Sequence, residues 1–404
     1  MYPLAHTTLL LATPAQKRTI WRSWWEHWYQ PNGMSLEVAE HYFTKADNFE
    51  ACLEGRATYW ALVNRSETEQ DDVLSSLRTI RRNSKVLEDG QVRDATSYVI
   101  TSVVTPSHHR KKGYATHMLS LLHYALAIPS PTLPPFPEQE FGQPPAPEHA
   151  PRDATYSTLW SDVGRDFYRT IRIGRGEGSR EGWVVGADQE VRYELSPAKE
   201  NVVDTSLPEG WQSFPSVSDI PSDLLATLSL HTLTTAQQQT PAKTLAYDPP
   251  TSPGILEFSI SRSLRHITAQ VLERNNGPIH RVYINKTTVP PSLLVLIPIY
   301  EPDEPATLKI SYLSLGSYQE AETTQHAAAA DVLSLLLSRA RMYSCIRIEG
   351  WQLPRPFVDA WAAWTRENGG AGSLLSHARE DHLGALAWYG RASRENVEML
   401  GGQL

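Results

Sequence analysis

The chain has 404 residues and a formal net charge of −8, because 45 acidic side chains outnumber 37 basic ones. This length predicts two or three domains that each bury a core. An acidic chain without a broad basic run is unsuited to nonspecific nucleic-acid binding. Two cysteines, Cys52 and Cys345, are too few and too far apart for a disulfide framework or a zinc site. They are typical of a reducing compartment, so we expect a cytoplasmic protein without a bound metal.

The apolar runs of the sequence are too short to predict a membrane span. The patch Leu9–Ala12 has no Lys or Arg before it and is a weak signal-peptide candidate. The longest later run, Leu293–Ile299, is far shorter than the roughly 20 residues of a spanning helix. We therefore expect a soluble protein with no membrane partner, and the oligomeric state stays open.

The first 90 residues predict two helices and two strands. Residues 14–30 place four tryptophans at helical spacing behind Thr13, a suitable N-cap, and a second helix is predicted at 35–43. Tryptophans in this pattern usually form a packed face rather than a ligand box. Strands are predicted at 57–63 and 73–87, and the basic residues of the second strand are assigned to a solvated face.

Residues 97–127 predict a strand, a basic turn and a helix, and the other elements are interpreted around them. Tyr98–Val104 is typical of a buried strand, and apolar residues recur at helical spacing from Gly113 onward. The turn between them, Arg110-Lys-Lys-Gly-Tyr-Ala, leads into a helix N-terminus, where free N–H groups and the helix dipole favour an anion. A surface turn is the alternative, but the order and lengths of the three elements favour a phosphate site.

Proline dominates residues 129–151, which predict a long surface loop without regular elements, either inert or a peptide ligand. After it, 154–164 alternates like a strand. Residues 165–173 predict a short helix that carries Phe167 and Tyr168. A half-buried tyrosine with a satisfied hydroxyl is the alternative to a functional Tyr168.

The second half predicts another α/β domain. Helices are expected at 222–230 and 320–342, and strands at 255–260, 281–286, 293–300, 307–315 and 345–351. The order strand, long helix, strand repeats the layout of 97–164, but no Arg-x-x-Gly-x-Ala precedes this long helix.

The tail, 379–390, combines acidic residues and a histidine with an aromatic pair. A C-terminal helix packing through Leu383, Leu386 and Trp388 would explain the apolar residues. It would not explain the adjacent acidic residues and histidine, which suit recognition of a cationic amine.

The segment 97–127 resembles motif A of the GNAT acetyltransferases, and Phe167-Tyr168 resembles the Phe-Tyr near the start of that fold's last helix. The resemblance implies an α/β fold with a mixed central sheet flanked by helices. It implies a catalytic domain at 1–200, with 129–151 as an inserted loop. A C-terminal α/β domain at 205–404, interpreted as a degenerate GNAT-like domain, is expected to help form the acceptor site.

A closer resemblance is to the fungal lysine N-acetyltransferase family. Four segments carry it: 74–82, 105–119, 159–164 and 381–390. The resemblance implies acetyl-CoA as cosubstrate and the side-chain amine of free lysine as acceptor, with direct transfer in a ternary complex. A polyamine, an amino sugar or a secondary metabolite as acceptor, and a GNAT-fold binding protein without catalysis, are the alternatives.

The resemblance also implies roles for single residues. The implied acetyl-CoA contacts are Val103, Val104, Arg110, Lys111, Gly113, Tyr114 and Ala115. Tyr168 is the implied acid that protonates the departing thiolate. The tail predicts acceptor contacts at Asp381, His382 and Trp388. No general base is assigned, because Tyr98–Val104 contains no carboxylate.

Overall fold

The computed structural model describes residues 2–400 except 131–132, 187–190, 196–205, 216–218, 257–281, 301–303, 318–323, 352, 368–373 and 379–381. The chain divides into two compact units. The first consists of Met1–Gly186, Pro241–Asp248 and Glu380–Leu400, and the second of Ala187–Thr240, Pro249–Arg379 and Gly401–Leu404. Within the described residues, no helix combines the length and apolar content needed to cross a bilayer.

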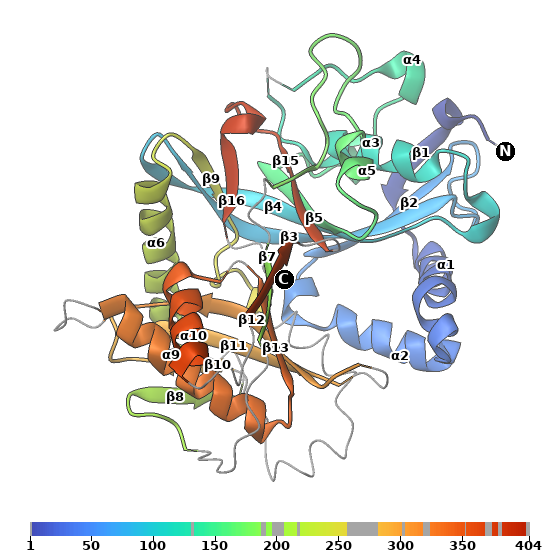
Figure 1. Ribbon diagram of the computed structural model, residues 1–404. Helices are drawn as coiled ribbons and strands as arrows, with labels where there is room; N and C mark the ends of the chain where they lie inside the picture. Colours follow the sequence, from blue (N-terminus) through green and yellow to red (C-terminus); the bar gives the residue numbers. More distant parts are fainter. Residues whose placement is uncertain are drawn as a thin grey trace. The chain divides into compact units, whose positions relative to one another are not determined.

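The first unit is built on a sheet of nine described strands (Figure 1). Its strands are β1 Thr7–Leu11, β2 Ala57–Asn64, β3 Ser75–Glu88, β4 Gln91–Val104, β5 Tyr156–Ser161, β6 Val184–Val185, β9 Thr244–Tyr247, β15 Leu383–Trp388 and β16 Val397–Leu400. The order is β1-β2-β3-β4-β5-β15-β6, and β9 joins β3 to β16. Neighbours are antiparallel except for the pairs β4–β5 and β9–β16.

Helices cover both faces of this sheet. They are α1 Pro14–Trp24, α2 Leu36–Asp47, α3 Tyr114–Leu126, α4 Glu138–Phe141 and α5 Asp166–Arg169. Alternate residues of β2 point to opposite faces. Trp60 packs in the same core cluster as α3, and Tyr59 packs with α1 and α2. The helix α3 therefore lies on one face, and α1 and α2 lie on the other.

The predicted first helix is confirmed, including its cap. The Thr13 side chain accepts a hydrogen bond from the backbone N–H of Gln16, and the Gln16 side chain accepts one from the backbone N–H of Thr13. Trp24 is buried in the core beneath α1, and a π-helical turn at Trp25–Tyr29 continues the helix. Trp28 at its end is exposed, so the tryptophan face is packed along most but not all of its length.

The solvated basic face expected on 73–87 is wrong for two arginines. Arg78 and Arg82 are both buried in β3. The guanidinium of Arg82 lies 3.0 Å from the Asp248 carboxylate, which also accepts a hydrogen bond from Tyr156. Asp248 directly follows β9, and the pairing of β9 with β3 could not be predicted from local sequence.

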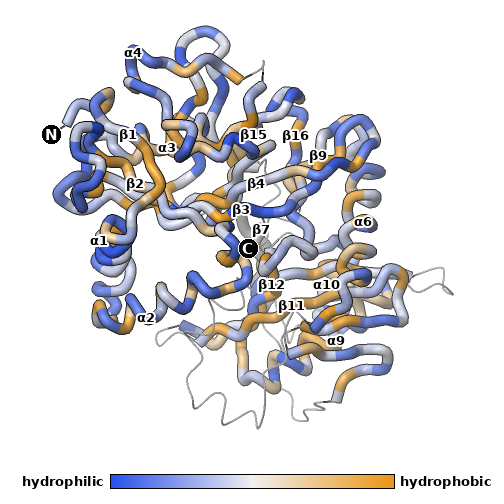
Figure 2. The backbone as a smooth tube through the Cα atoms, turned by 180° about the vertical axis from the view of Figure 1, so that it is seen from behind, coloured by the Kyte–Doolittle hydropathy of each residue, from blue (hydrophilic) through white to orange (hydrophobic). Residues whose placement is uncertain are grey.

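The second unit holds a sheet with the order β14-β7-β13-β12-β11-β10-β8. Its strands are β7 Val191–Leu195, β8 Trp211–Phe214, β10 Val282–Asn285, β11 Ser292–Ile299, β12 Thr307–Ser314, β13 Arg347–Trp351 and β14 Leu374–Ala378, and its long helices are α6 Ser222–Gln239, α9 Thr324–Met342 and α10 Arg355–Glu367. The hydrophobic centre of this unit includes β11, which is apolar along its length (Figure 2). The parallel strands β12 and β13 flank α9 in sequence, as β4 and β5 flank α3.

The division expected at residue 200 differs from the two units. Near the C-terminus, β15 pairs with β5 and β6 in the first sheet. In the second sheet, β7 lies between β13 and β14. The first unit therefore takes its β15 strand from the last part of the chain, because strand pairing and not chain order decides membership.

Three further expectations change. The tail forms the strand β15 rather than a helix, because both edges of 383–388 find a partner strand. Residues 129–151 include the short helix α4, and Phe141 is buried in the main core, so this segment packs on the protein. Of the strand expected at 255–260, the described residues 255–256 are helical, and the remainder lies outside the described residues.

Candidate functional site

The strands β4 and β5 separate at their carboxyl ends. They pair in parallel only from Ser97 to Val99, although β4 continues to Val104. Ser102 has a φ of +57° at a register shift between β3 and β4, and such a bulge changes the direction of the following groups. On its β5 side, 100–104 has no strand partner among the described residues. Val103, which has no register partner in β3 or β5, is open to an extended ligand, whereas the Val104 carbonyl already accepts a hydrogen bond from the Ser75 hydroxyl at 3.1 Å.

The basic turn leads from β4 into α3 as predicted. Lys111 and Gly113 both have positive φ, +61° and +80°. A Cβ on Gly113 would lie 3.5 Å from Leu4 Cδ1, an ordinary contact, so glycine is favoured by backbone conformation and not by space. The backbone N–H groups of residues 113–115 have no acceptor in the described part of the chain. A free helix N-terminus of this kind binds anions.

The side chains of the turn differ in how accessible they are to a ligand. Arg110 and Lys111 are exposed. The Arg110 guanidinium donates to the carbonyl oxygen of Thr105 at 3.1 Å and to Nδ1 of His27 at 3.2 Å. Burial lowers the pKa of His27, and the nearby Arg110 charge lowers it further. Tyr114 is buried, and its hydroxyl accepts a hydrogen bond from the Tyr2 backbone, so only its N–H can serve the turn.

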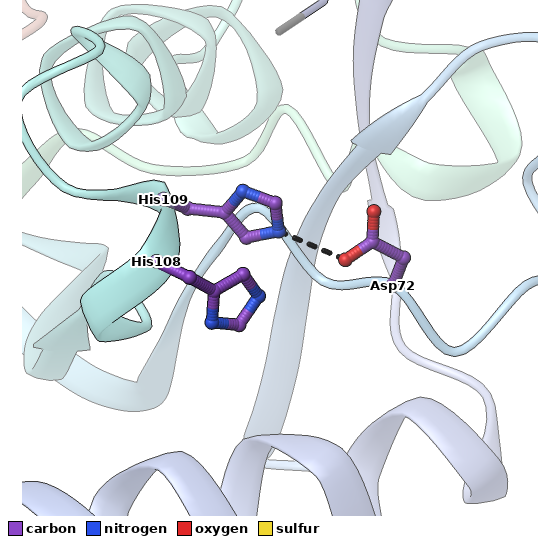
Figure 3. Close-up of side chains that lie close together, drawn as sticks. All are labelled: Asp72, His108 and His109. Carbon is purple, nitrogen blue, oxygen red and sulfur yellow. Dashed lines mark hydrogen bonds and ion pairs between the residues drawn. The ribbon is translucent and has the colours of Figure 1, made fainter.

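A histidine pair links this turn to the loop before β3. Ser107–His109 forms a single helical turn, and Nε2 of His109 lies 2.8 Å from the Asp72 carboxylate (Figure 3). Both imidazole rings and the carboxylate face one another, with donor atoms within 4.8 Å, a set that could hold a metal ion. Arg110 and Lys112 follow directly and disfavour a cation there, so we interpret the contact as a tether of the turn.

Tyr168 lies on α5, shortly after β5. Its ring packs edge-on against Trp183, with the ring centroids 6.3 Å apart. Burial raises the pKa of the Tyr168 phenol to about 12, and the Asp162 carboxylate raises it as well. The side chain therefore holds its proton at neutral pH, as a general acid must before it acts.

A buried hydrogen-bond chain, which local sequence did not indicate, fixes the backbone around Tyr168. Nε2 of His123 donates to the carbonyl oxygen of Ile171, so Nδ1 accepts from the Tyr389 hydroxyl at 3.0 Å. Ser157 continues the chain to Trp183, whose backbone N–H donates to the Tyr168 carbonyl. The chain joins α3, β5 and the residue after β15, and these lie far apart in sequence.

The three predicted acceptor residues are placed differently. Asp381 lies outside the described residues. His382 is half-exposed, and its ring and backbone N–H both contact the Asp162 carboxylate. Trp388 is buried and stacked on Tyr156, which gives it a packing role in the first unit. Asp162 was not a predicted site residue, because its contact depends on the register between β5 and β15.

Comparison with known proteins supports the fold through solved structures alone. No protein-family model matches the sequence, and no curated protein matches it. A GCN5-related N-acetyltransferase from Anabaena variabilis ATCC 29413 matches 95% of this chain and 73% of its own chain, with 13% identity and a TM-score of 0.50.

Two further solved structures match with lower scores. A GCN5-related N-acetyltransferase from Kribbella flavida matches 95% of this chain and 72% of its own, with 13% identity and a TM-score of 0.45. A tandem GNAT protein from the clavulanic acid biosynthesis pathway matches 96% and 99%, with 10% identity and a TM-score of 0.37. We base the fold on the Anabaena protein: the predicted mixed α/β architecture is confirmed, and the chain has the fold of the GCN5-related N-acetyltransferases.

Proposed function

We propose that this protein is an acetyl-CoA-dependent N-acetyltransferase that acts on a small primary amine. One observation carries the proposal: the separation of β4 from β5 lies beside a free helix N-terminus at Gly113. An extended thioester arm with a pyrophosphate at one end matches this combination. The edge of β4 offers backbone hydrogen bonds, and the turn offers N–H groups to an anion.

Each predicted cosubstrate residue has a proposed role in that arrangement. Val103 offers its backbone groups to the pantetheine arm, and Val104, whose carbonyl is held by the Ser75 hydroxyl, follows it on the same edge of β4. The N–H groups of Gly113, Tyr114 and Ala115 bind the pyrophosphate, and glycine permits the left-handed backbone that aims them. Arg110 and Lys111 add positive charge at the exposed mouth of the turn.

The proposed chemistry is direct transfer from thioester to amine. The acceptor nitrogen attacks as the neutral amine, since an ammonium has no lone pair. Tyr168 then donates its phenolic proton to the departing thiolate. Burial raises the pKa of Tyr168 to about 12, so the phenol is protonated at neutral pH, as an acid must be before it acts.

We propose free lysine as the first acceptor to test. This finer proposal rests on the sequence resemblance of residues 74–82, 105–119, 159–164 and 381–390 to the fungal lysine N-acetyltransferases. Polyamines, amino sugars and amine-bearing secondary metabolites are the competing acceptors. A GNAT-fold binding protein without catalysis is the competing class, and it predicts acetyl-CoA binding without turnover.

The test combines calorimetry with a screen for released thiol. Purified full-length protein is titrated with acetyl-CoA, then incubated with acetyl-CoA and a panel of lysine, ornithine, spermidine and glucosamine. We expect binding, and release of CoA that depends on lysine. Turnover with another amine would mean that this amine, and not lysine, is the acceptor. Acetyl-CoA binding without turnover would favour a GNAT-fold binding protein without catalysis. Absence of acetyl-CoA binding would refute the proposal.

A further inference from the structure

The first unit has a small basic pocket that the proposed reaction does not use. The residues that line it are Arg180, Glu181, Arg391, Ser393 and Arg394, and its volume is about 340 Å³. Sites for small molecules usually have volumes of about 300–1,000 Å³. The pocket is therefore at the lower end of this range and has room for a compact ligand.

Strand pairing places this pocket at the opposite end of the strands from the phosphate turn. The turn follows the carboxyl end of β4, and β5 runs parallel to β4. In β15, Leu383 pairs with the carboxyl end of β5, and Trp388 pairs with Tyr156 at its amino end. Arg391 and Arg394 follow Trp388, so they lie near the amino end of β5. A ligand in the pocket would therefore not occupy the proposed cosubstrate site.

Positive charge exceeds negative charge around the pocket. Glu181 is the carboxylate in the lining, and the Arg169 guanidinium already binds it at 2.6 Å. Neither Arg180 nor Arg391 forms a side-chain ion pair or hydrogen bond within the part of the chain that the structure describes. Each guanidinium therefore keeps its forked N–H donors, which match the geometry of a phosphate or carboxylate group.

The lack of a partner matters most for Arg180, which is partly buried. Burial lowers the pKa of its guanidinium, because a charge is less well solvated inside the protein. Elsewhere in this unit, the buried Arg82 has a partner in the Asp248 carboxylate at 3.0 Å. A partly buried cation without an opposite charge is destabilising. A bound anion would supply the charge that Arg180 lacks.

The walls of the pocket are held in place by the protein itself. Arg394 donates to three backbone carbonyl oxygens, those of Leu386, Val397 and Val184, at 3.2, 2.9 and 3.2 Å. Its guanidinium is thus fixed between β15, β16 and β6. The backbone N–H of Gly182 donates to a carbonyl oxygen of α5 at 3.1 Å, which fixes the chain beside Glu181. A preformed site of this kind loses little conformational freedom when it binds a ligand.

We propose that this pocket is a second ligand site, which binds a small anion that carries phosphate or carboxylate groups. Arg180 and Arg391 donate hydrogen bonds to the anion, and Arg394 adds a fixed positive charge. Two unpaired arginines favour an anion with more than one negative charge over a halide. The inference does not depend on the proposed acetyl transfer, because the pocket and the phosphate turn lie at different ends of the sheet.

Isothermal titration calorimetry of the full-length protein tests this site. The protein is titrated with inorganic phosphate and with citrate, in sodium chloride at constant ionic strength. We expect saturable binding that Arg180→Gln and Arg391→Gln each weaken about tenfold to a hundredfold, the contribution of a hydrogen bond to a charged group. Arg394 is left unchanged, because it joins three strands. Arg366→Gln, at an exposed arginine of α10 in the second unit, removes the same charge and should leave the affinity unchanged.

Arg110→Gln separates the pocket from the phosphate turn, since both attract anions. Binding in the pocket should survive this substitution. A preference for phosphate or for citrate would identify the group that the pocket recognises. Absence of saturable binding, or equal affinity in wild type, Arg180→Gln and Arg391→Gln, would overturn the inference. Binding that is lost in Arg110→Gln would also overturn it. A protein that binds no acetyl-CoA would refute the proposed function and leave this inference unaffected.

Discussion

Replacing Gly113 with alanine tests whether the left-handed turn forms the phosphate site. Gly113 has a φ of +80°, and the added Cβ would meet Leu4 Cδ1 at 3.5 Å, which is ordinary van der Waals contact. Steric clash therefore contributes little. The cost is the left-handed conformation itself, about 1–2 kcal/mol for a residue with a Cβ. If alanine at residue 113 keeps the left-handed conformation in the folded protein, this strain should lower the thermal midpoint by about 2–8 °C.

The effect on binding follows from the N–H groups that the turn aims. Relaxation of residue 113 to a right-handed conformation would turn away at least one donor from the pyrophosphate. A hydrogen bond to a charged group contributes about 1.5–3 kcal/mol, so we expect acetyl-CoA affinity to fall about tenfold to a hundredfold. Isothermal titration calorimetry measures this loss directly.

Gly33 provides the matched control. It has a φ of +78°, no atom lies within 4 Å of its hypothetical Cβ, and it ends the helical turn 30–32 rather than beginning α3. Gly33→Ala should cost similar stability and leave acetyl-CoA affinity unchanged. Equal acetyl-CoA affinity in Gly113→Ala, Gly33→Ala and wild type would refute the phosphate-site assignment.

Three further predictions address the acid, the buried histidines and the tail. Tyr168→Phe should lower kcat at least tenfold with little change in acetyl-CoA affinity, and equal turnover in steady-state assays would remove Tyr168 as the acid. Burial lowers the pKa of His117 to about 4 and the pKa of His123 to about 3. In the unfolded chain both imidazoles have their ordinary pKa of about 6.5, so below that pH the unfolded chain binds more protons than the folded one. The free energy of unfolding should therefore be highest above pH 6.5 and fall as the pH drops toward 4, by at most about 1.4 kcal/mol per pH unit for each histidine. Urea unfolding at pH 7 and pH 5 measures this difference in free energy, which should be smaller in the His123→Phe variant. Deleting 380–404 removes β15 and β16 and should abolish acetyl-CoA binding, whereas a deletion that binds normally would show that the sheet does not need these strands.

Local sequence was sufficient where neighbours along the chain determine the structure. The cap at Thr13 depends on residues three positions apart, and the turn at Gly113 depends on a glycine before a helix. Both were predicted. The helix α9 was also predicted, because its apolar periodicity extends over several turns.

Local sequence was insufficient where partners come from distant parts of the chain. The buried Arg82 is neutralised by Asp248, which is 166 positions away. The His123–Tyr389 hydrogen bond spans 266 positions, and the Asp162–His382 contact spans 220. Each of these contacts depends on which strands pair and in which register, so no spacing rule within a short window could identify it.

The late position of β15 also has a consequence for how the protein is made. Synthesis proceeds from the N-terminus, so β6, which ends at Val185, is made almost 200 residues before 383–388, and β5 is made earlier still. The strand 383–388 lies between them. Until then the nascent chain carries two unpaired strand edges, which invite pairing with other chains. We expect the first unit to stay sensitive to protease on ribosomes stalled before residue 383. We also expect it to depend more on chaperones when the synthesis of residues 186–388 takes longer. Protection of stalled chains that end at residue 370 would contradict this order of folding.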